Sequence, residues 1–348
     1  MYHLRLKGKH YQMGVKRGAI FSKAKITFPL HLDEFQIHHG IESEKILKKY
    51  FPEICEEIKG VSDTMGMDYS IVASWMLCMG CCMYNLEENI PKEIRGCTAF
   101  AYTKENRVLY GRNNELPPYL RDGSKAELYQ PKNANAFILT TSSFINGEEG
   151  INEHGLSVAM TFVMTQCKNI RPGFNSCFIV RYLLEKADCT NQAMDMLMEL
   201  PIASNCNILI ADKSGNMVVI ECTSFKKRVR EAIPTKEGHV VCCVNGFSSD
   251  EFQQYDESNG DDYHSKERYE VVMKYFMTQH DNSSIEEIEK LLKGEYGFMC
   301  QYEEDDFETV WSSVFDLKDC MIYRAEGDPR KKKFIEDKRL HDVINKRK

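Results

Sequence analysis

The sequence predicts an α+β protein in which two mainly antiparallel sheets pack together beneath outer layers of helices. Helical patterns fill the first 96 of its 348 residues, where strand signals are nearly absent. From residue 97 onward, short runs rich in β-branched and aromatic residues dominate, which is typical of strands. Helical stretches recur between these runs, so helices are expected on the outer faces of the sheets.

Each element has its own signal. Early helices are expected over residues 11–21, 41–60 and 69–84, where apolar residues recur at helical spacing. A turn at Lys104-Glu105-Asn106 joins the first two strands into a hairpin. The predicted strands are TAFAYT, RVLYGR, NAFILTT, GLSVAMTFV, CNILIAD, NMVVIEC and HVVCCV, with residues 309–316 and 321–324. Later helices are predicted over residues 176–187, 191–199, 265–279 and 284–293, the last opening with the capping box Ser284-Ile-Glu-Glu287.

Charge and composition exclude several classes of partner. The net charge of −7 arises from 52 acidic and 45 basic residues with both signs interspersed, so no basic stripe is expected to follow a nucleic-acid backbone. No stretch reaches the roughly 18 apolar residues that span a bilayer, and the first residues lack the apolar core of a secretory signal. We therefore expect a cytoplasmic protein that binds neither nucleic acid nor membrane. Its 14 cysteines lie mostly in apolar runs and are expected to be buried, reduced thiols.

The change from helical to strand patterns falls at Arg95-Gly96-Cys97-Thr98. A glycine accepts strained backbone angles and leaves its carbonyl open to attack by the thiol that follows it. Hydrolysis after this attack would free the α-amino group of Cys97, which titrates near pH ~8 and can exchange a proton with its own thiol. The alternative is a chance Gly-Cys pair in a turn, because the dipeptide alone has little specificity.

Two charged residues are expected beside Cys97. The predicted hairpin returns Arg112 and Glu115, within the run GRNNE, toward the cysteine. Arg112 would offer a cation to the thiolate, and Glu115 a carboxylate to the new ammonium group. The alternative is an ordinary surface ion pair at a strand end.

At these residues the chain resembles the acyl-coenzyme A:6-aminopenicillanate acyltransferase family of self-cleaving cysteine peptidases, and more distantly the choloylglycine hydrolases. The resemblance covers almost the whole chain. Its motifs are GKHYQMG at 8–14, GCTAF at 96–100, GRN at 111–113, GINEHGLSVA at 150–159, NILIAD at 207–212, VNGF at 244–247, SKERY at 265–269 and WSSVFDL at 311–317. Within the fourth motif, Asn152 and Gly155 are expected to be turn residues, with Gly155 in the left-handed position.

The resemblance implies the four-layer αββα sandwich of the N-terminal-nucleophile (Ntn) hydrolases and an inactive precursor, or zymogen, that cuts itself between Gly96 and Cys97. Residues 1–96 would form a helical propeptide or small subunit and residues 97–330 the catalytic domain, followed by a charged tail at 331–348.

Individual residues can be matched to the family's site. Cys97 corresponds to the nucleophile and Arg112 to the arginine beside it. Glu115 stands where the family usually has aspartate, which keeps the charge and lengthens the side chain. Asn245 matches the asparagine whose side-chain NH₂ stabilises the oxyanion, a contribution of about 3 kcal/mol.

Two other positions are less constrained by the resemblance. The second oxyanion asparagine of bile-salt-type enzymes falls near Thr161 or Phe162, where this chain has no amide, which weakens a bile-salt assignment. Thr161 and Phe162 are expected to be substrate-binding residues, with Thr161 offering the nearest hydroxyl in place of the missing donor. Arg268 lies at the start of a helix capped by Ser265, from which it either reaches the substrate or the cleavage site or stays solvated.

The implied reaction is hydrolysis of a linear, non-peptide amide in a small N-acyl substrate. An acyltransferase, moving an acyl group from an amide or from a thioester such as acyl-CoA to an amine, would use the same residues. A binding or scaffold relative is a further alternative, and a papain-like Cys/His enzyme lacks a supporting histidine motif. The substrate and the oligomeric state, a homo-oligomer included, stay open.

Other motifs give no site of their own. Cys78 and Cys81 form a CxxC inside an apolar helical run, without a second ligand pair at zinc spacing. His38-His39 is expected to be solvated, and the acidic residues 256–262 lack the register of a calcium loop. Neither a metal nor a cofactor is therefore expected.

Overall fold

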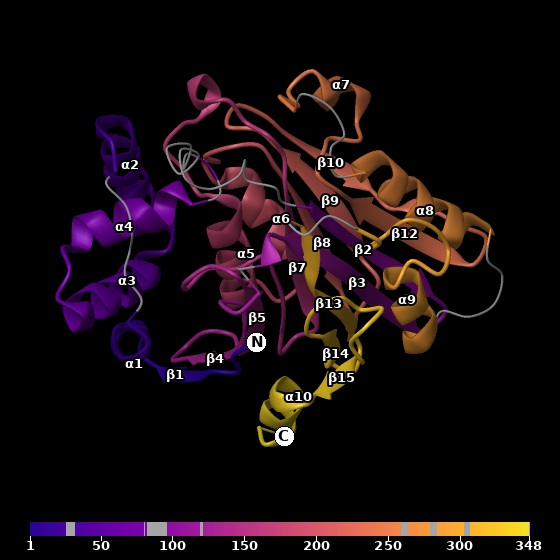
Figure 1. Ribbon diagram of the computed structural model, residues 1–348, viewed down its shortest axis with the longest axis horizontal. Coiled ribbons are helices and arrows are strands. Elements are labelled where there is room, and N and C mark those ends of the chain that lie inside the picture. Colours follow the sequence, from indigo (N-terminus) through magenta and orange to yellow (C-terminus); the bar gives the residue numbers. More distant parts are fainter. Residues whose placement is uncertain are drawn as a thin grey trace.

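Two sheets form the centre of the computed structural model, which describes residues 1–25, 32–79, 81, 96–118, 121–258, 264–278, 284–302 and 307–347 (Figure 1). The first sheet has the order β1 (Arg5–Gly8), β4 (Lys125–Pro131), β5 (Phe137–Thr141), β6 (Glu149–Asn152), β7 (Leu156–Phe162), β8 (Cys206–Asp212), β9 (Met217–Cys222), β10 (Lys227–Glu231). The second has the order β11 (Ile233–Pro234), β12 (Gly238–Cys243), β2 (Gly96–Lys104), β3 (Arg107–Leu116), β13 (Glu308–Asp316), β14 (Met321–Ala325), β15 (Ile335–Asp337).

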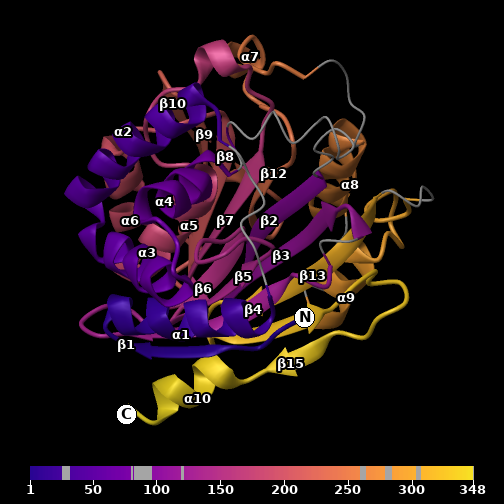
Figure 2. The ribbon, with the colours of Figure 1, turned by 60° about the vertical axis from the view of Figure 1, so that its left-hand side comes forward.

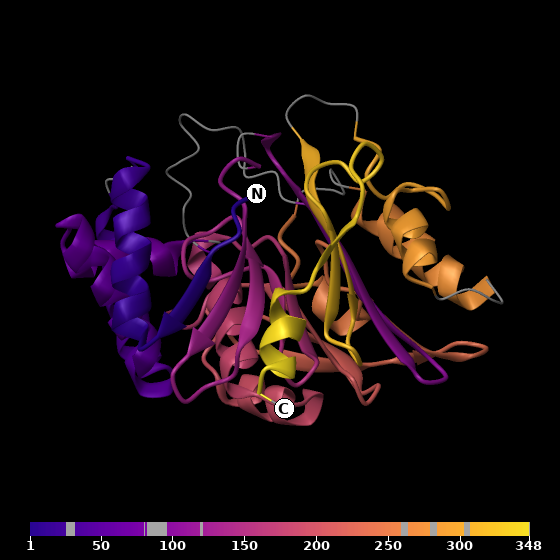
Figure 3. The same cartoon turned by 90° about the horizontal axis from the view of Figure 1, so that it is seen from below.

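The sheets face each other across an apolar core and carry helices on their outer faces. Small, aliphatic and aromatic side chains fill the space between them, among them Ala99, Leu209, Tyr110 and Phe315. The helices on the first sheet are α5 (Ser176–Lys186) and α6 (Thr190–Glu199), and those on the second are α8 (Ser265–Thr278) and α9 (Ile285–Leu292). Seen from below, the layers follow one another as helices, sheet, sheet and helices (Figure 3). The predicted four-layer α+β sandwich is confirmed.

The helices before residue 96 add to the layer outside the first sheet. They are α1 (His10–Lys23), α2 (Glu34–Tyr50), α3 (Pro52–Met65) and α4 (Tyr69–Cys78), which come to the front in Figure 2. Their apolar side chains share one core with α5 and the outer face of this sheet. Buried ion pairs reinforce the contact, since Arg17 of α1 pairs with Glu127 of β4 and Arg181 of α5 lies 2.7 Å from Glu57 of α3.

The structure corrects two predictions for this segment. The helix expected over residues 41–60 is two helices, because the chain turns at Phe51 and Pro52 opens α3, where a missing N–H costs no hydrogen bond. Strand signals were expected to be nearly absent, yet residues 5–8 form β1, which pairs in parallel with β4 at the edge of the first sheet. The third expected helix ends at Cys78, and residues 82–84 lie outside the described residues.

Beyond residue 96, the predicted strands and helices are present. Half of the predicted capping box forms: the Ser284 side chain accepts a hydrogen bond from the Glu287 N–H, whereas the Glu287 carboxylate accepts from Lys290 and Tyr296. Several strands that lacked a continuous apolar run were not predicted, namely β4, β6, β10, β11 and β15. The charged segment after residue 330 also contains α10 (Arg339–Asn345), whose Leu340 and Val343 pack into the core between the sheets. Within the described residues, no helix is long and apolar enough to cross a bilayer.

Candidate active site

The hairpin of β2 and β3 sets the geometry around Cys97. Its register pairs Lys104 with Arg107 at the turn and places Cys97 directly opposite Asn114 at the other end. Residues directly opposite each other in an antiparallel pair share one face of the sheet. The side chains of Cys97 and Asn114, and that of Arg112 two residues earlier, therefore lie on the same face.

The thiol of Cys97 lies in a buried polar cluster. Its Sγ is 3.3 Å from Asn114 Oδ1 and 3.2 Å from Arg112 Nη2, and Cys97 is 3% exposed. Arg112 Nη2 also donates to Asn114 Oδ1 at 2.6 Å, while Nη1 donates to the Met160 carbonyl in β7 of the other sheet. Burial raises the pKa of the Cys97 thiol to about 11, and the Arg112 charge opposes this rise. The thiol of the intact chain is therefore protonated at neutral pH.

Asn245 binds the backbone of Cys97. This asparagine follows β12, the neighbour of β2, and its Oδ1 accepts the Cys97 backbone N–H at 2.5 Å. Its Nδ2 donates to the Phe162 carbonyl at 3.0 Å, which fixes the orientation of the amide. One N–H of the side chain is thereby used, and among the described residues the other has no further acceptor.

Glu115 and Arg268 lie on the opposite face of the hairpin from the thiol. Both are fully buried, with Arg268 Nη1 3.9 Å from a Glu115 oxygen. Arg268 also donates to Thr98 Oγ1 at 2.6 Å and to Asn245 Oδ1 at 3.2 Å, so it links the two faces. Burial raises the pKa of Glu115 to about 7 against the influence of Arg268 and Arg112.

Gly96 is required by packing at its position. A Cβ atom at this residue would lie 2.8 Å from Cζ of Phe307 and 2.9 Å from Cβ of Glu115, closer than real Cβ contacts. The expectation of strained backbone angles is not supported, because Gly96 is absent from the described glycines with positive φ. Space, rather than a left-handed conformation, explains the glycine.

Thr161 and Phe162 contribute to the site differently from the prediction. The Thr161 hydroxyl donates to the Val244 carbonyl at 2.7 Å and accepts from Asn207 Nδ2 at 3.0 Å. Its proton is thus used to hold the strand end that carries Asn245 and is not directed at an oxyanion. Phe162 contributes its backbone carbonyl, which orients Asn245.

A cavity of about 560 Å³ opens beside Asn245. Aromatic and polar groups line it, including Phe247 and Tyr269, with Asp256, Lys266 and Glu270 as charged members. Ser265, the residue at the start of α8, also lines this cavity and accepts a hydrogen bond from Arg268 at 3.2 Å. Asn245 thus borders both this cavity and the polar cluster around Cys97, whereas Cys97, Arg112 and Asn114 are not among the lining residues.

The cysteine, histidine and acidic motifs outside this site form no metal site in the described part of the chain, where no group of three or more His, Cys, Asp or Glu side chains could hold a metal ion. Cys78 donates to the Gln36 carbonyl at 3.4 Å. His39 is buried, not solvated as expected, and burial lowers its pKa to about 4. The predicted left-handed conformation of Gly155 is confirmed, with φ of +77°. Cys82 and most of the acidic run 256–262 lie outside the described residues.

The structure therefore brings together Cys97, Arg112, Glu115, Asn245 and Arg268. Sequence reasoning missed Asn114. The predicted turn at residues 104–106 contained the necessary signal, because a two-residue turn at Glu105 and Asn106 fixes the strand register and thereby pairs residue 97 with residue 114. The partners of Arg268 and Glu115 depend on how α8 and β13 pack, and no local pattern indicates them.

Comparison with known proteins gives one family. The family model described as acyl-coenzyme A:6-aminopenicillanic acid acyl-transferase matches residues 102–331. Among solved structures, penicillin V acylase from Agrobacterium tumefaciens shares 15% identity with a TM-score of 0.45, over 66% of this chain and 83% of the other. Two variants of conjugated bile acid hydrolase from Clostridium perfringens share 14% and 16% identity with TM-scores of 0.42 and 0.44, over 66% of this chain and 89% of each. No curated protein sequence matches.

The raised pKa of Glu115 predicts a pH-dependent effect on stability. Between about pH 4.5 and 7 the native carboxyl holds a proton that the unfolded chain has lost, so native stability falls as pH rises through this window. Glu115→Gln removes this titration. The variant should therefore gain about 2–4 kcal/mol relative to the parent between about pH 5 and pH 8.

Urea unfolding at several pH values measures this gain. A Cys97→Ala background in both proteins removes any cleavage at residue 97, and Glu115→Asp, which keeps a titrating carboxyl, is the control. A stability difference that stays constant across the pH range would contradict the predicted titration.

Asn114 should set the reactivity of the thiol. Its Oδ1 accepts from the neutral thiol and competes for Arg112, so Asn114→Ala should lower the pKa of Cys97 by about one unit, whereas Asn114→Asp should raise it by a similar amount. The rate of Cys97 alkylation by iodoacetamide against pH, read by peptide mass, reports this pKa. The exposed Cys189 serves as an internal reference. Unchanged profiles in both variants would remove Asn114 from this role.

Proposed function

Since the chain belongs to the acyl-coenzyme A:6-aminopenicillanic acid acyl-transferase family, we propose that it is an N-terminal-cysteine amidohydrolase that activates itself by cutting the Gly96-Cys97 bond. The observation that carries the proposal is the environment of Cys97. Its thiol contacts Arg112 and Asn114, and its backbone nitrogen is bound by Asn245. The proposed substrate is a small N-acyl compound with a linear, non-peptide amide.

Self-cleavage proceeds by a shift of the acyl group from nitrogen to sulfur. The thiol gives up its proton and attacks the Gly96 carbonyl, a C–S bond forms, the C–N bond breaks, and the Cys97 nitrogen takes a proton to leave as an amine. Water then hydrolyses the thioester and leaves the Gly96 carboxylate. Burial raises the pKa of the thiol to about 11, so attack requires stabilisation of the thiolate, and Arg112 lies where it provides this stabilisation.

The freed α-amino group becomes the base of the mature enzyme. It forms at the nitrogen that already donates to Asn245 Oδ1, so the same acceptor holds the new group. An α-amino group titrates near pH ~8 and can take the proton of the Cys97 thiol. Glu115 lies with Arg268 on the other face of the β2–β3 hairpin, and from there its negative charge stabilises the ammonium form of the Cys97 α-amino group.

Acyl transfer then uses the same residues. The thiolate attacks the substrate carbonyl, and the oxyanion accepts hydrogen bonds from the remaining N–H of Asn245 Nδ2 and from a backbone N–H. Asn114 Nδ2 is a buried donor without a hydrogen-bond partner among the described residues, and it is a candidate second donor in place of the amide absent at Thr161 and Phe162. The ammonium group protonates the leaving amine, and water releases the acyl group from Cys97.

An acyltransferase is the second candidate, favoured by the family's description. It would form the same thioester on Cys97, from an amide or from acyl-CoA, and pass the acyl group to an amine instead of water.

Residues 1–96 would remain attached as a small subunit beside the catalytic domain of residues 97–330. Strand cysteines such as Cys206, Cys222 and Cys243 are buried thiols outside any disulfide, which supports a reducing compartment, and we place the protein in the cytoplasm.

The proposal predicts a covalent acyl group on Cys97. Short and long N-acyl amino acids should be hydrolysed by the wild type, and rapid acid quench should reveal the added acyl mass on the Cys97 peptide. Cys97→Ala should stay folded, uncut and inactive, while the matched control Cys189→Ala should match the wild type. Amide turnover by Cys97→Ala would overturn the proposed mechanism.

Glu115 variants test how the site is held. In fully cleaved protein assayed at about pH 8, where the Glu115 carboxyl is ionised, Glu115→Gln should lower kcat/KM by about 10²- to 10⁴-fold because it loses the charge that stabilises the ammonium group. Glu115→Asp, the usual family residue, should keep a substantial part of the activity. Cleavage is checked by mass in every variant, and equal activity of wild type and cleaved Glu115→Gln would remove Glu115 from the catalytic site.

A further inference from the structure

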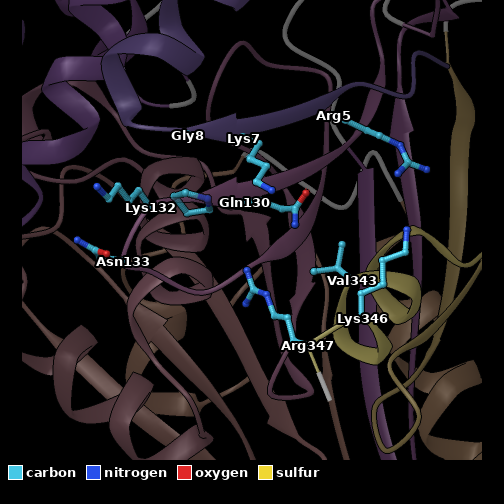
Figure 4. Close-up of a pocket in the computed structure, with 10 residues that line it drawn as sticks. Arg5, Lys7, Gly8, Gln130, Lys132, Asn133, Val343, Lys346 and Arg347 are labelled. Atoms are coloured by element: carbon cyan, nitrogen blue, oxygen red, sulfur yellow. The ribbon is translucent and has the colours of Figure 1, made fainter.

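A second cavity lies where the two ends of the described chain meet. Its volume is about 700 Å³, and it is bounded by β1, by the end of β4 with the loop that follows it, and by the end of α10. Arg5 and Lys7 extend from β1, and Lys346 and Arg347 from the end of α10, on opposite sides of the same space (Figure 4). These side chains belong to segments that lie far apart in the sequence.

The lining of this cavity is cationic. Five of its ten residues carry a positive charge, two carry side-chain amides, and none of the lining residues carries a carboxylate. The cationic residues are Arg5, Lys7, Lys132, Lys346 and Arg347. Arg347 pairs with Glu153, which is outside the lining. In a chain of net charge −7, such a concentration of like charge departs from the interspersed pattern of the sequence.

Backbone contacts hold the walls of the cavity in place. The parallel pairing of β1 with β4 sets Lys7 opposite Gln130 and Gly8 opposite Pro131. Arg339, the first residue of α10, donates to the Leu4 carbonyl at 3.3 Å and to the Ala126 carbonyl at 3.0 Å. The same helix is anchored by Leu340 and Val343 in the core. The cationic side chains thus start from fixed backbone positions on three sides.

Like charges gathered around one concave space repel one another, and a bound anion removes this repulsion. The cavity has the volume of a small-molecule site, larger than a single phosphate needs. Its donors are spread over three segments, which suits a ligand with more than one anionic group. We propose that this cavity binds a small molecule carrying two or more phosphate groups.

Such a ligand would join the first strand to the last helix. Its negative groups would contact Lys7 on one side and Lys346 on the other, so binding should stabilise the docking of both segments on the sheet edge. Measurement of this site requires no turnover, and its outcome is independent of the proposed amidohydrolase activity.

Calorimetric titration of the full-length protein with inorganic pyrophosphate tests the proposal. Pyrophosphate should bind, more tightly than inorganic phosphate, and should raise the Tm; affinity should fall as ionic strength rises. Adenosine diphosphate tests whether the cavity also recognises an organic group attached to the phosphates. Tighter binding than pyrophosphate supports a nucleotide-like ligand in this cavity, whereas equal affinity supports recognition of the diphosphate alone. Absence of binding by both compounds at millimolar concentration would overturn the proposal.

Variants locate the binding. Lys7→Gln combined with Lys346→Gln should weaken pyrophosphate binding about tenfold or more, whereas Lys7→Arg combined with Lys346→Arg should retain it. Lys274→Gln, on the exposed side of α8, is the control for loss of one surface charge and should bind as the wild type does. Equal affinity of the Gln double variant and wild type would place the anion elsewhere and contradict the proposal.

Discussion

The register of the β2–β3 hairpin is the constraint on which the site depends. Because Cys97 lies opposite Asn114, strand alternation puts the thiol and Arg112 on the face toward the other sheet, and Gly96 and Glu115 on the face toward α8. A slip of one residue would exchange these faces. The tight packing of Gly96 against Phe307 and Glu115 opposes such a slip, so the residue before Cys97 also fixes the position of the cysteine.

Fully buried charges then connect the layers of the sandwich. Arg112 reaches the Met160 carbonyl in the opposite sheet, and Arg268 joins Glu115, Thr98 and Asn245 from the helix layer. Burying guanidinium groups is costly unless each donor is paired, and here the partners are also the groups around the cysteine. The interactions that satisfy these charges are therefore the ones that orient Cys97, which links the stability of the fold to the chemistry of the site.

The sequence predicted the elements whose signal is local. The hairpin turn, the Ser284 cap and the apolar strands could be identified because each depends on its own residues. Strands such as β1 and β4 alternate in polarity and are stabilised by partners distant in sequence, so their own residues did not predict them. Glu127 of β4 is likewise stabilised by a distant partner, since it is buried against Arg17 of α1. Resemblance to a family supplied Asn245, whereas the role of Thr161 in holding the Val244 carbonyl needed three-dimensional packing.

The central claim is that the bond before Cys97 is cut by Cys97 itself. Intact mass of the purified protein, under denaturing conditions and with time after synthesis, measures this most directly. The account predicts two fragments, residues 1–96 and 97–348, that co-purify under native conditions, with the second beginning at an unmodified Cys97 and with no cut in Cys97→Ala. A single uncut chain with an unmodified Cys97 after long incubation would contradict it.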